Sequence, residues 1–173
     1  MDDLGNWLKP TWFLDWESPD VLAFSREATE GANSARERAS RLFYAVRDGF
    51  RYDPYTASHE AEDYRASAIV KTSSAYCAPK AILLTAAARA EGVPARIGFA
   101  DVRNHLASPQ DFDGTADALL HPFDRDGRRH MEYVNERGSF DDVPFDEMIR
   151  ALKETYGEDV GLSAVESEPI FEA

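Results

Sequence analysis

The stretch YCAPKAILLTAAARAEGVPAR, residues 76–96, decides the fold of this chain. It predicts a helix over residues 77–91, because a proline in the first turn is followed by alanine, leucine and other good helix formers. Gly92 and Pro94 then end that helix. The next residues predict a strand over 95–102 that is apolar on both faces, which is typical of a buried strand. A buried helix leading into a buried strand indicates an α+β domain.

The sequence before this stretch predicts an N-terminal arm and two further helices. Residues 5–17 carry all three tryptophans in an irregular stretch that must pack against the domain. Ser18 and Pro19 form a helix-start signal, and Gly31 ends that helix. The second helix is predicted over residues 34–48, where apolar residues recur on one face.

The sequence after the strand is less regular. Residues 128–134 predict either a short strand or a helical turn. A last helix is predicted from residue 142 to about 157, with acidic residues in its first turn that suit the helix dipole. We therefore expect one domain over residues 1–157, followed by an acidic C-terminal tail over 158–173.

Composition excludes several classes of partner. The formal net charge is −13, from 32 acidic and 19 basic residues, and such a surface repels nucleic acid and anionic lipid. A lone cysteine fits a reducing compartment, and the N-terminus lacks the basic and apolar regions of a signal peptide. We therefore expect a cytoplasmic protein without a membrane or nucleic-acid partner.

Cys77 is the strongest candidate for chemistry. The thiolate is the reactive form of cysteine, and the free amides and positive dipole end at a helix start favour an anion. The same amides can hold an oxyanion during acyl transfer, and Lys80 adds positive charge one turn on. The competing interpretation is that Cys77 is a small buried hydrophobic residue.

Five blocks of sequence resemble the transglutaminase-like superfamily. Residues 76–81 and 92–96 resemble its nucleophilic cysteine at the start of a buried helix and the G-(I/V)-P-A-R turn that follows. Residues 43–52 resemble the helix before that cysteine, and residues 100–106 and 121–133 resemble a bacterial branch. The resemblance implies a transglutaminase-like, cysteine-proteinase-like α+β fold with helices around a central cysteine helix. It also implies acyl transfer or amide hydrolysis through a thioester on the cysteine.

The chain departs from the family pattern after residue 106. The family uses a Cys-His-Asp triad whose histidine and aspartate lie on the two strands after that block, and neither pattern occurs here. Residues 108–110 run almost directly into residues 111–114, so we expect a missing hairpin and a reduced antiparallel sheet. Either the hairpin is deleted, or the 173-residue sequence lacks a segment that the working protein has. Ala75 also replaces a glycine that the family keeps.

Four histidines could replace the missing base. His105 is the first choice, because it follows the strand that leaves the cysteine helix, and His130 is the second. His59 lies in a polar loop and is expected to be solvated. The resemblance gives both His121 and His130 a structural or substrate-facing role, which for His130 is the alternative to acting as the base.

Several polar groups near the predicted strand end are candidates for substrate binding. They are Tyr76, Asp101, Arg103 and Asn104. The alternative for the last three is an ion pair and capping contacts that close the strand.

Two functions remain open at this point. In the first, Cys77 catalyses transfer or hydrolysis of an amide- or ester-bearing peptide or small molecule. In the second, the protein is a catalytically inactive scaffold that binds a ligand or protein partner. We expect no cofactor, and no metal-ligand spacing occurs in the sequence. An open sheet edge would allow a homodimer.

Overall fold

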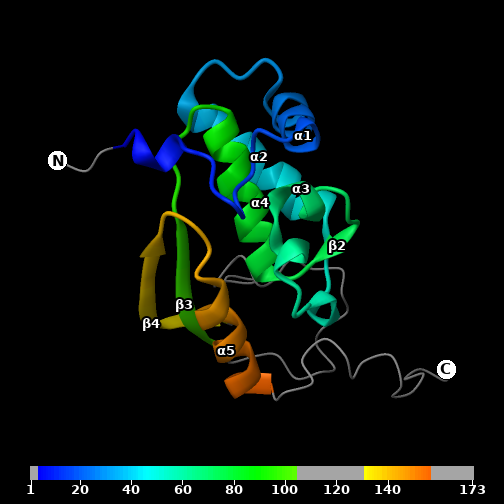
Figure 1. Cartoon of the computed structure of the whole chain (residues 1–173). Coiled ribbons are helices and arrows are strands. Elements are labelled where there is room, and N and C mark those ends of the chain that lie inside the picture. The colour runs from blue at the N-terminus through cyan, green and yellow to red at the C-terminus, as the bar shows by residue number, and fades with distance from the viewer. Residues whose placement is uncertain (1–3, 105–130, 157–173) are drawn as a thin grey trace.

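The computed structural model describes residues 4–104 and 131–156 (Figure 1). In chain order its elements are α1 (Pro19–Thr29), α2 (Ala35–Gly49), β1 (Arg51–Tyr52), α3 (Ala66–Ile69), β2 (Ser74–Ala75), α4 (Cys77–Ala90), β3 (Ile97–Asn104), β4 (Met131–Phe140) and α5 (Phe145–Tyr156). Short 3-10 turns cover Asn6–Leu8, Pro54–Thr56 and Ala61–Tyr64. Helices combined with small sheets confirm the α+β class.

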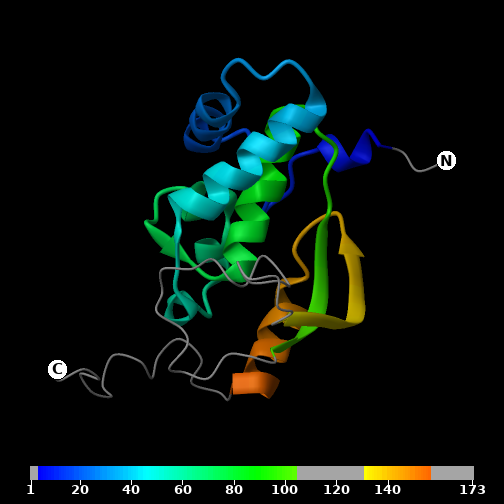
Figure 2. The same cartoon turned by 180° about the vertical axis from the view of Figure 1, so that it is seen from behind.

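Helix α4 is the centre of the molecule. Most of its residues are apolar or small, and most are buried, including Ile82 and Leu83 at 0 % exposure; Lys80 and Arg89 are buried as well. A helix that is apolar all round needs neighbours on all faces. Helices α1, α2 and α3 surround α4, while β3, β4 and α5 form a second group beside it (Figures 1 and 2).

The ends of the helices follow the predicted signals. Ser18 caps α1 by accepting a hydrogen bond from the Val21 N–H at 3.4 Å. At the end of α4, Gly92 has φ +71°, and the N–H of Val93 reaches the carbonyl of Ala88 at 2.9 Å. This is a Schellman ending, which favours glycine because of the positive φ.

The sheets are small. Strands β1 and β2 form one parallel pair, and β3 and β4 form an antiparallel pair whose register runs from Ile97 opposite Phe140 to Asn104 opposite Met131. The predicted strand over 95–102 is therefore present but lies two residues later. Of the ambiguous segment 128–134, residues 131–134 belong to a ten-residue strand, β4, and residues 128–130 lie outside the described residues. A local pattern could not give its length, because pairing with β3 extends it.

Strand β3 is less buried than its sequence predicted. Ile97 is 1 % exposed, but Gly98 is exposed and Phe99 is only half-buried, against Phe140. Among the residues that the structure describes, β4 is its one strand neighbour. The predicted tail over 158–173 and residues 108–114, where a missing hairpin is expected, lie outside the described residues.

The N-terminal arm packs against the domain as expected. Leu14 is fully buried, and the carbonyl of Phe13 accepts the N–H of Ala66 at 2.8 Å. The indole of Trp16 donates to the carbonyl of Leu8 at 3.1 Å. The arm thus joins the core cluster that also holds the start of α4 and Met148 of α5.

Candidate functional site

Cys77 is the first residue of α4, and it is exposed. Exposure of the residue favours a reactive role over the competing interpretation of a buried hydrophobic residue. Of the first four N–H positions of this helix, Pro79 has none, and the N–H of Lys80 bonds to the carbonyl of Tyr76 at 3.3 Å. The amides of Cys77 and Ala78 remain, and the Tyr76 side chain does not cap them.

Both amides act on the sulfur. The backbone N–H groups of Ala78 and Cys77 lower the pKa of the Cys77 thiol, as expected for a helix start. Desolvation opposes them and is larger, so the pKa lies above its ordinary value. Part of the residue reaches solvent, but protein atoms surround the thiol closely enough to penalise the thiolate. The helix start alone therefore does not activate this cysteine.

Lys80 does not reach toward the thiol. Its side chain is 2 % exposed, and its ammonium donates to the carbonyl of Arg47 near the end of α2 at 3.1 Å. The cation thus lies at the negative end of another helix, where it is stabilised by that helix dipole.

Tyr76, a predicted substrate-binding residue, is buried directly before the cysteine. Its hydroxyl lies 2.8 Å from the hydroxyl of Tyr64, and the two rings meet edge to face. Desolvation raises the pKa of both phenols, Tyr76 most strongly, so both remain protonated at neutral pH. Its part in substrate binding remains a prediction.

Asp101, the second predicted substrate-binding residue, lies at an irregularity of the β3–β4 pair. Arg137 and Asn135 are the two extra residues of β4 at this register shift, and both side chains bond to the Asp101 carboxylate, at 2.5 and 3.4 Å. The hydrogen bond from Arg137 is the main reason that the pKa of Asp101 lies below its ordinary value. Asp101 is thus ion-paired with Arg137, a partner that the sequence analysis did not name, and its part in substrate binding remains a prediction.

The remaining predicted site residues are described less fully. Arg103 and Asn104 belong to the end of β3, but their side chains lie outside the described residues, as do His105 and His130. His59 is the one histidine that the structure describes. It is half-buried in the loop before Tyr64, and no hydrogen bond joins it to Cys77.

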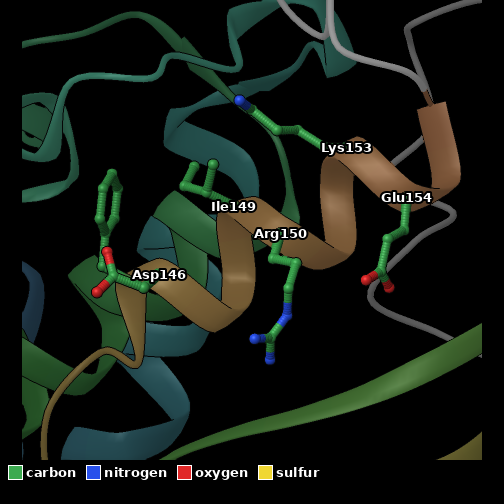
Figure 3. Close-up of a pocket in the computed structure, with 6 residues that line it drawn as sticks. Asp146, Ile149, Arg150, Lys153 and Glu154 are labelled. Carbon is green, nitrogen blue, oxygen red and sulfur yellow. The ribbon is translucent and has the colours of Figure 1, made fainter.

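A cavity of about 400 Å³ lies along α5 and not at the cysteine. It is lined by Phe145, Asp146, Ile149, Arg150, Lys153 and Glu154. Figure 3 shows Ile149 and Lys153 projecting from one side of α5, and Arg150 and Glu154 from the other. Among the described residues, the whole lining comes from α5, and no second described element contributes to it.

Metal ligands and membrane-spanning helices can be assessed only for the described part of the chain. Within residues 4–104 and 131–156, His, Cys, Asp and Glu side chains form no group of three or more that could hold a metal ion. In the same residues, no helix combines the length and the apolar character needed to cross a bilayer.

The sequence analysis did not identify Tyr64, whose side chain contacts the residue directly before the cysteine. Tyr64 is 1 % exposed, and its hydroxyl contacts both Tyr76 and the backbone of Ser58. The sequence did contain a signal for this residue, because an aromatic side chain within a polar segment indicates that its ring packs into the core. Its partner before α4 is twelve residues away, and no local pattern identifies it.

Comparison with known proteins gives one match. A family model described as the transglutaminase-like superfamily matches residues 22–131, which is more than half of the chain. The matched range contains Cys77, Asp101, His105 and His130. No curated protein and no solved structure matches the chain.

Proposed function

Because the chain belongs to the transglutaminase-like superfamily, we propose that Cys77 is the nucleophile of a cysteine-dependent acyl transfer or amide hydrolysis. One observation carries this proposal. Cys77 is exposed at the uncapped start of the central helix, with the amides of Cys77 and Ala78 beside its sulfur. A nucleophile needs access to the substrate, and an oxyanion needs donors that no side chain already occupies.

The reaction balances without a cofactor. The thiolate attacks the carbonyl carbon of an amide or ester, a C–S bond forms, and the carbonyl electron pair moves to oxygen. That pair returns as the C–N or C–O bond breaks, and the leaving group takes up a proton. Water or an amine then attacks the thioester, and Cys77 leaves as thiolate.

A base must remove the proton of the Cys77 thiol, because the raised pKa of this thiol leaves it protonated when unassisted. We assign this role to His105, with His130 as the second candidate. A positioned general base typically contributes about 10²- to 10⁴-fold in rate. Substrate groups are expected at Tyr76, Asp101, Arg103 and Asn104. The substrate class is an amide- or ester-bearing peptide or small molecule, and we place the reaction in the bacterial cytoplasm.

The alternative function is a catalytically inactive scaffold that binds a ligand or partner. The raised pKa of Cys77 favours it, because an unassisted thiol of this kind is mostly protonated at neutral pH. The two functions differ in turnover.

The test uses p-nitrophenyl acetate as the acyl donor. Any exposed thiol can be acetylated once, so the decisive quantity is nitrophenol released beyond one equivalent of protein. We expect multiple turnovers that disappear in Cys77→Ala and fall in His105→Gln or His130→Gln, with His59→Gln as the matched control. An added primary amine separates transfer from hydrolysis. Release that stops at one equivalent in the unchanged protein would refute the enzymatic proposal and leave the scaffold.

A further inference from the structure

The hydroxyl of Tyr64 makes three polar contacts beneath the start of α4. It lies 3.0 Å from the carbonyl oxygen of Ser58, 3.2 Å from the N–H of the same residue, and 2.8 Å from the hydroxyl of Tyr76. Two of these contacts go to one backbone residue, so Tyr64 is fixed to the loop before it. Its ring is also held, edge to face, by Phe145 at the start of α5, with 5.3 Å between ring centres.

Counting protons gives the direction of these bonds. A phenol has one proton to donate and can accept two. The Ser58 carbonyl can only accept, so the Tyr64 proton lies on that bond. The Ser58 N–H can only donate, so Tyr64 accepts it. All three contacts are satisfied only if Tyr76 donates its proton to Tyr64.

This arrangement fixes the residue that precedes the nucleophile. Tyr76 is the N-cap residue of α4, and its carbonyl accepts the N–H of Lys80, a hydrogen bond of the first turn. The phenol of Tyr76 is anchored at its far end by Tyr64, and the residue is 5 % exposed. A side chain fixed at both ends restricts the backbone between them. That backbone sets where the amides of Cys77 and Ala78 point.

We propose that Tyr64 is a positioning residue for Cys77, which acts by holding the phenol of Tyr76 and thereby the orientation of the first turn of α4. The inference rests on the proposed function, in which Cys77 is the nucleophile. Tyr64 acts through its bond to Tyr76 and takes no part in the reaction itself. Without its hydroxyl, Tyr76 loses its acceptor, and the two amides lose their fixed direction toward the sulfur.

The test is the pH dependence of Cys77 alkylation by iodoacetamide in Tyr64→Phe, which keeps the ring and removes the hydroxyl. The two amides lower the pKa of Cys77, so their misalignment should raise the midpoint of the profile. We expect a rise of about half to one pH unit, which corresponds to a roughly three- to tenfold slower reaction at neutral pH. Tyr44→Phe, at an exposed tyrosine of α2, should leave the profile unchanged.

A second variant keeps the proposal testable if Tyr64→Phe does not fold. Tyr76→Phe removes the other end of the same bond and should shift the midpoint in the same direction. The double variant should shift the midpoint no further than the larger single shift, because both substitutions remove the same hydrogen bond between Tyr64 and Tyr76. A lower unfolding temperature with an unchanged alkylation profile would show a purely structural role and overturn the proposal. Alkylation requires no turnover, so this result is independent of whether the acyl-transfer test succeeds.

Discussion

The guanidinium of Arg89, near the end of α4, donates to the backbone carbonyl of Asp141 at 2.8 Å, although the two residues lie 52 positions apart in the sequence. Its other two bonds reach the carbonyls of Lys9 at 2.7 Å and Ala95 at 2.9 Å. One side chain thus joins the N-terminal arm, the segment leading into β3 and the loop before α5. Desolvation lowers the pKa of Arg89, and the nearby carboxylates of Asp141 and Asp142 counteract it.

Replacing Arg89 by lysine should destabilise the whole fold. An ammonium keeps the charge but cannot present a planar set of donors to three separate carbonyls. At least one buried carbonyl then loses its partner, and hydrogen bonds to charged groups contribute about 1.5–3 kcal/mol each. We expect Arg89→Lys to lower the free energy of unfolding by about 3 kcal/mol. Urea titration measures this value.

The matched control for that experiment is Arg26→Lys. Arg26 is exposed on α1, and its replacement should change the free energy of unfolding by less than about 0.5 kcal/mol. Equal effects of the two substitutions would contradict the joining role of Arg89.

The paired phenols beneath Cys77 should make the fold sensitive to alkaline pH. Desolvation raises the pKa of Tyr64 and Tyr76 in the folded protein above about 10, the ordinary value for tyrosine. The unfolded chain therefore ionises first as the pH rises. Their contribution to stability is complete below about pH 10 and decreases above it.

The measurement is the free energy of unfolding from pH 8 to 11, in a Cys77→Ser background that removes the titrating thiol. The decrease above pH 10 should be smaller in Tyr76→Phe, because one of the two groups no longer ionises on unfolding. Tyr55→Phe, at a tyrosine with 70 % exposure, should retain the full decrease. An identical pH dependence in Tyr76→Phe and the unchanged protein would argue against the buried pair.

The family resemblance implies a glycine where this chain has Ala75, and this position provides a further prediction. Ala75 lies in β2, is 3 % exposed, and has no positive φ, so the backbone here does not require glycine. Restoring the family residue with Ala75→Gly should lower the free energy of unfolding by about 1 kcal/mol, because glycine adds freedom to the unfolded chain and loses a buried methyl group. Thermal unfolding measures the change, and a gain in stability would contradict this account of the position.

The parts of the fold that the sequence predicted are those with local signals. Helix α4 was predicted to within one residue, because its proline, alanines and Gly92 act over one or two turns. Cys77 at its start follows from the same signals. Such signals do not extend to the side-chain contacts of Tyr76, whose hydroxyl partner lies in another segment.

What the sequence could not give are contacts between distant segments. The three carbonyls bound by Arg89 and the bond between Tyr64 and Tyr76 depend on how elements pack, and no periodicity encodes them. The direction of the net pKa shift of Cys77 could not be predicted from the sequence either. A helix start predicts the stabilising amides, but the opposing desolvation depends on the atoms packed around the thiol.

The irregular β3–β4 pair requires glycine at one position. Gly138 pairs with Phe99 next to the register shift and has φ +114°, a conformation that residues with a Cβ rarely adopt. An added Cβ would meet only the ring of Phe140, at 3.6 Å, so backbone strain and not crowding decides the outcome. We expect Gly138→Ala to lower the free energy of unfolding by about 1–2 kcal/mol.

Gly98→Ala on the facing strand is the matched control, since Gly98 has no positive φ and its Cβ would make ordinary contacts of 3.8 and 3.9 Å. Urea titration should therefore separate the two alanine variants by about 1 kcal/mol or more, and equal stabilities would mean that the positive φ at Gly138 carries no strain for alanine.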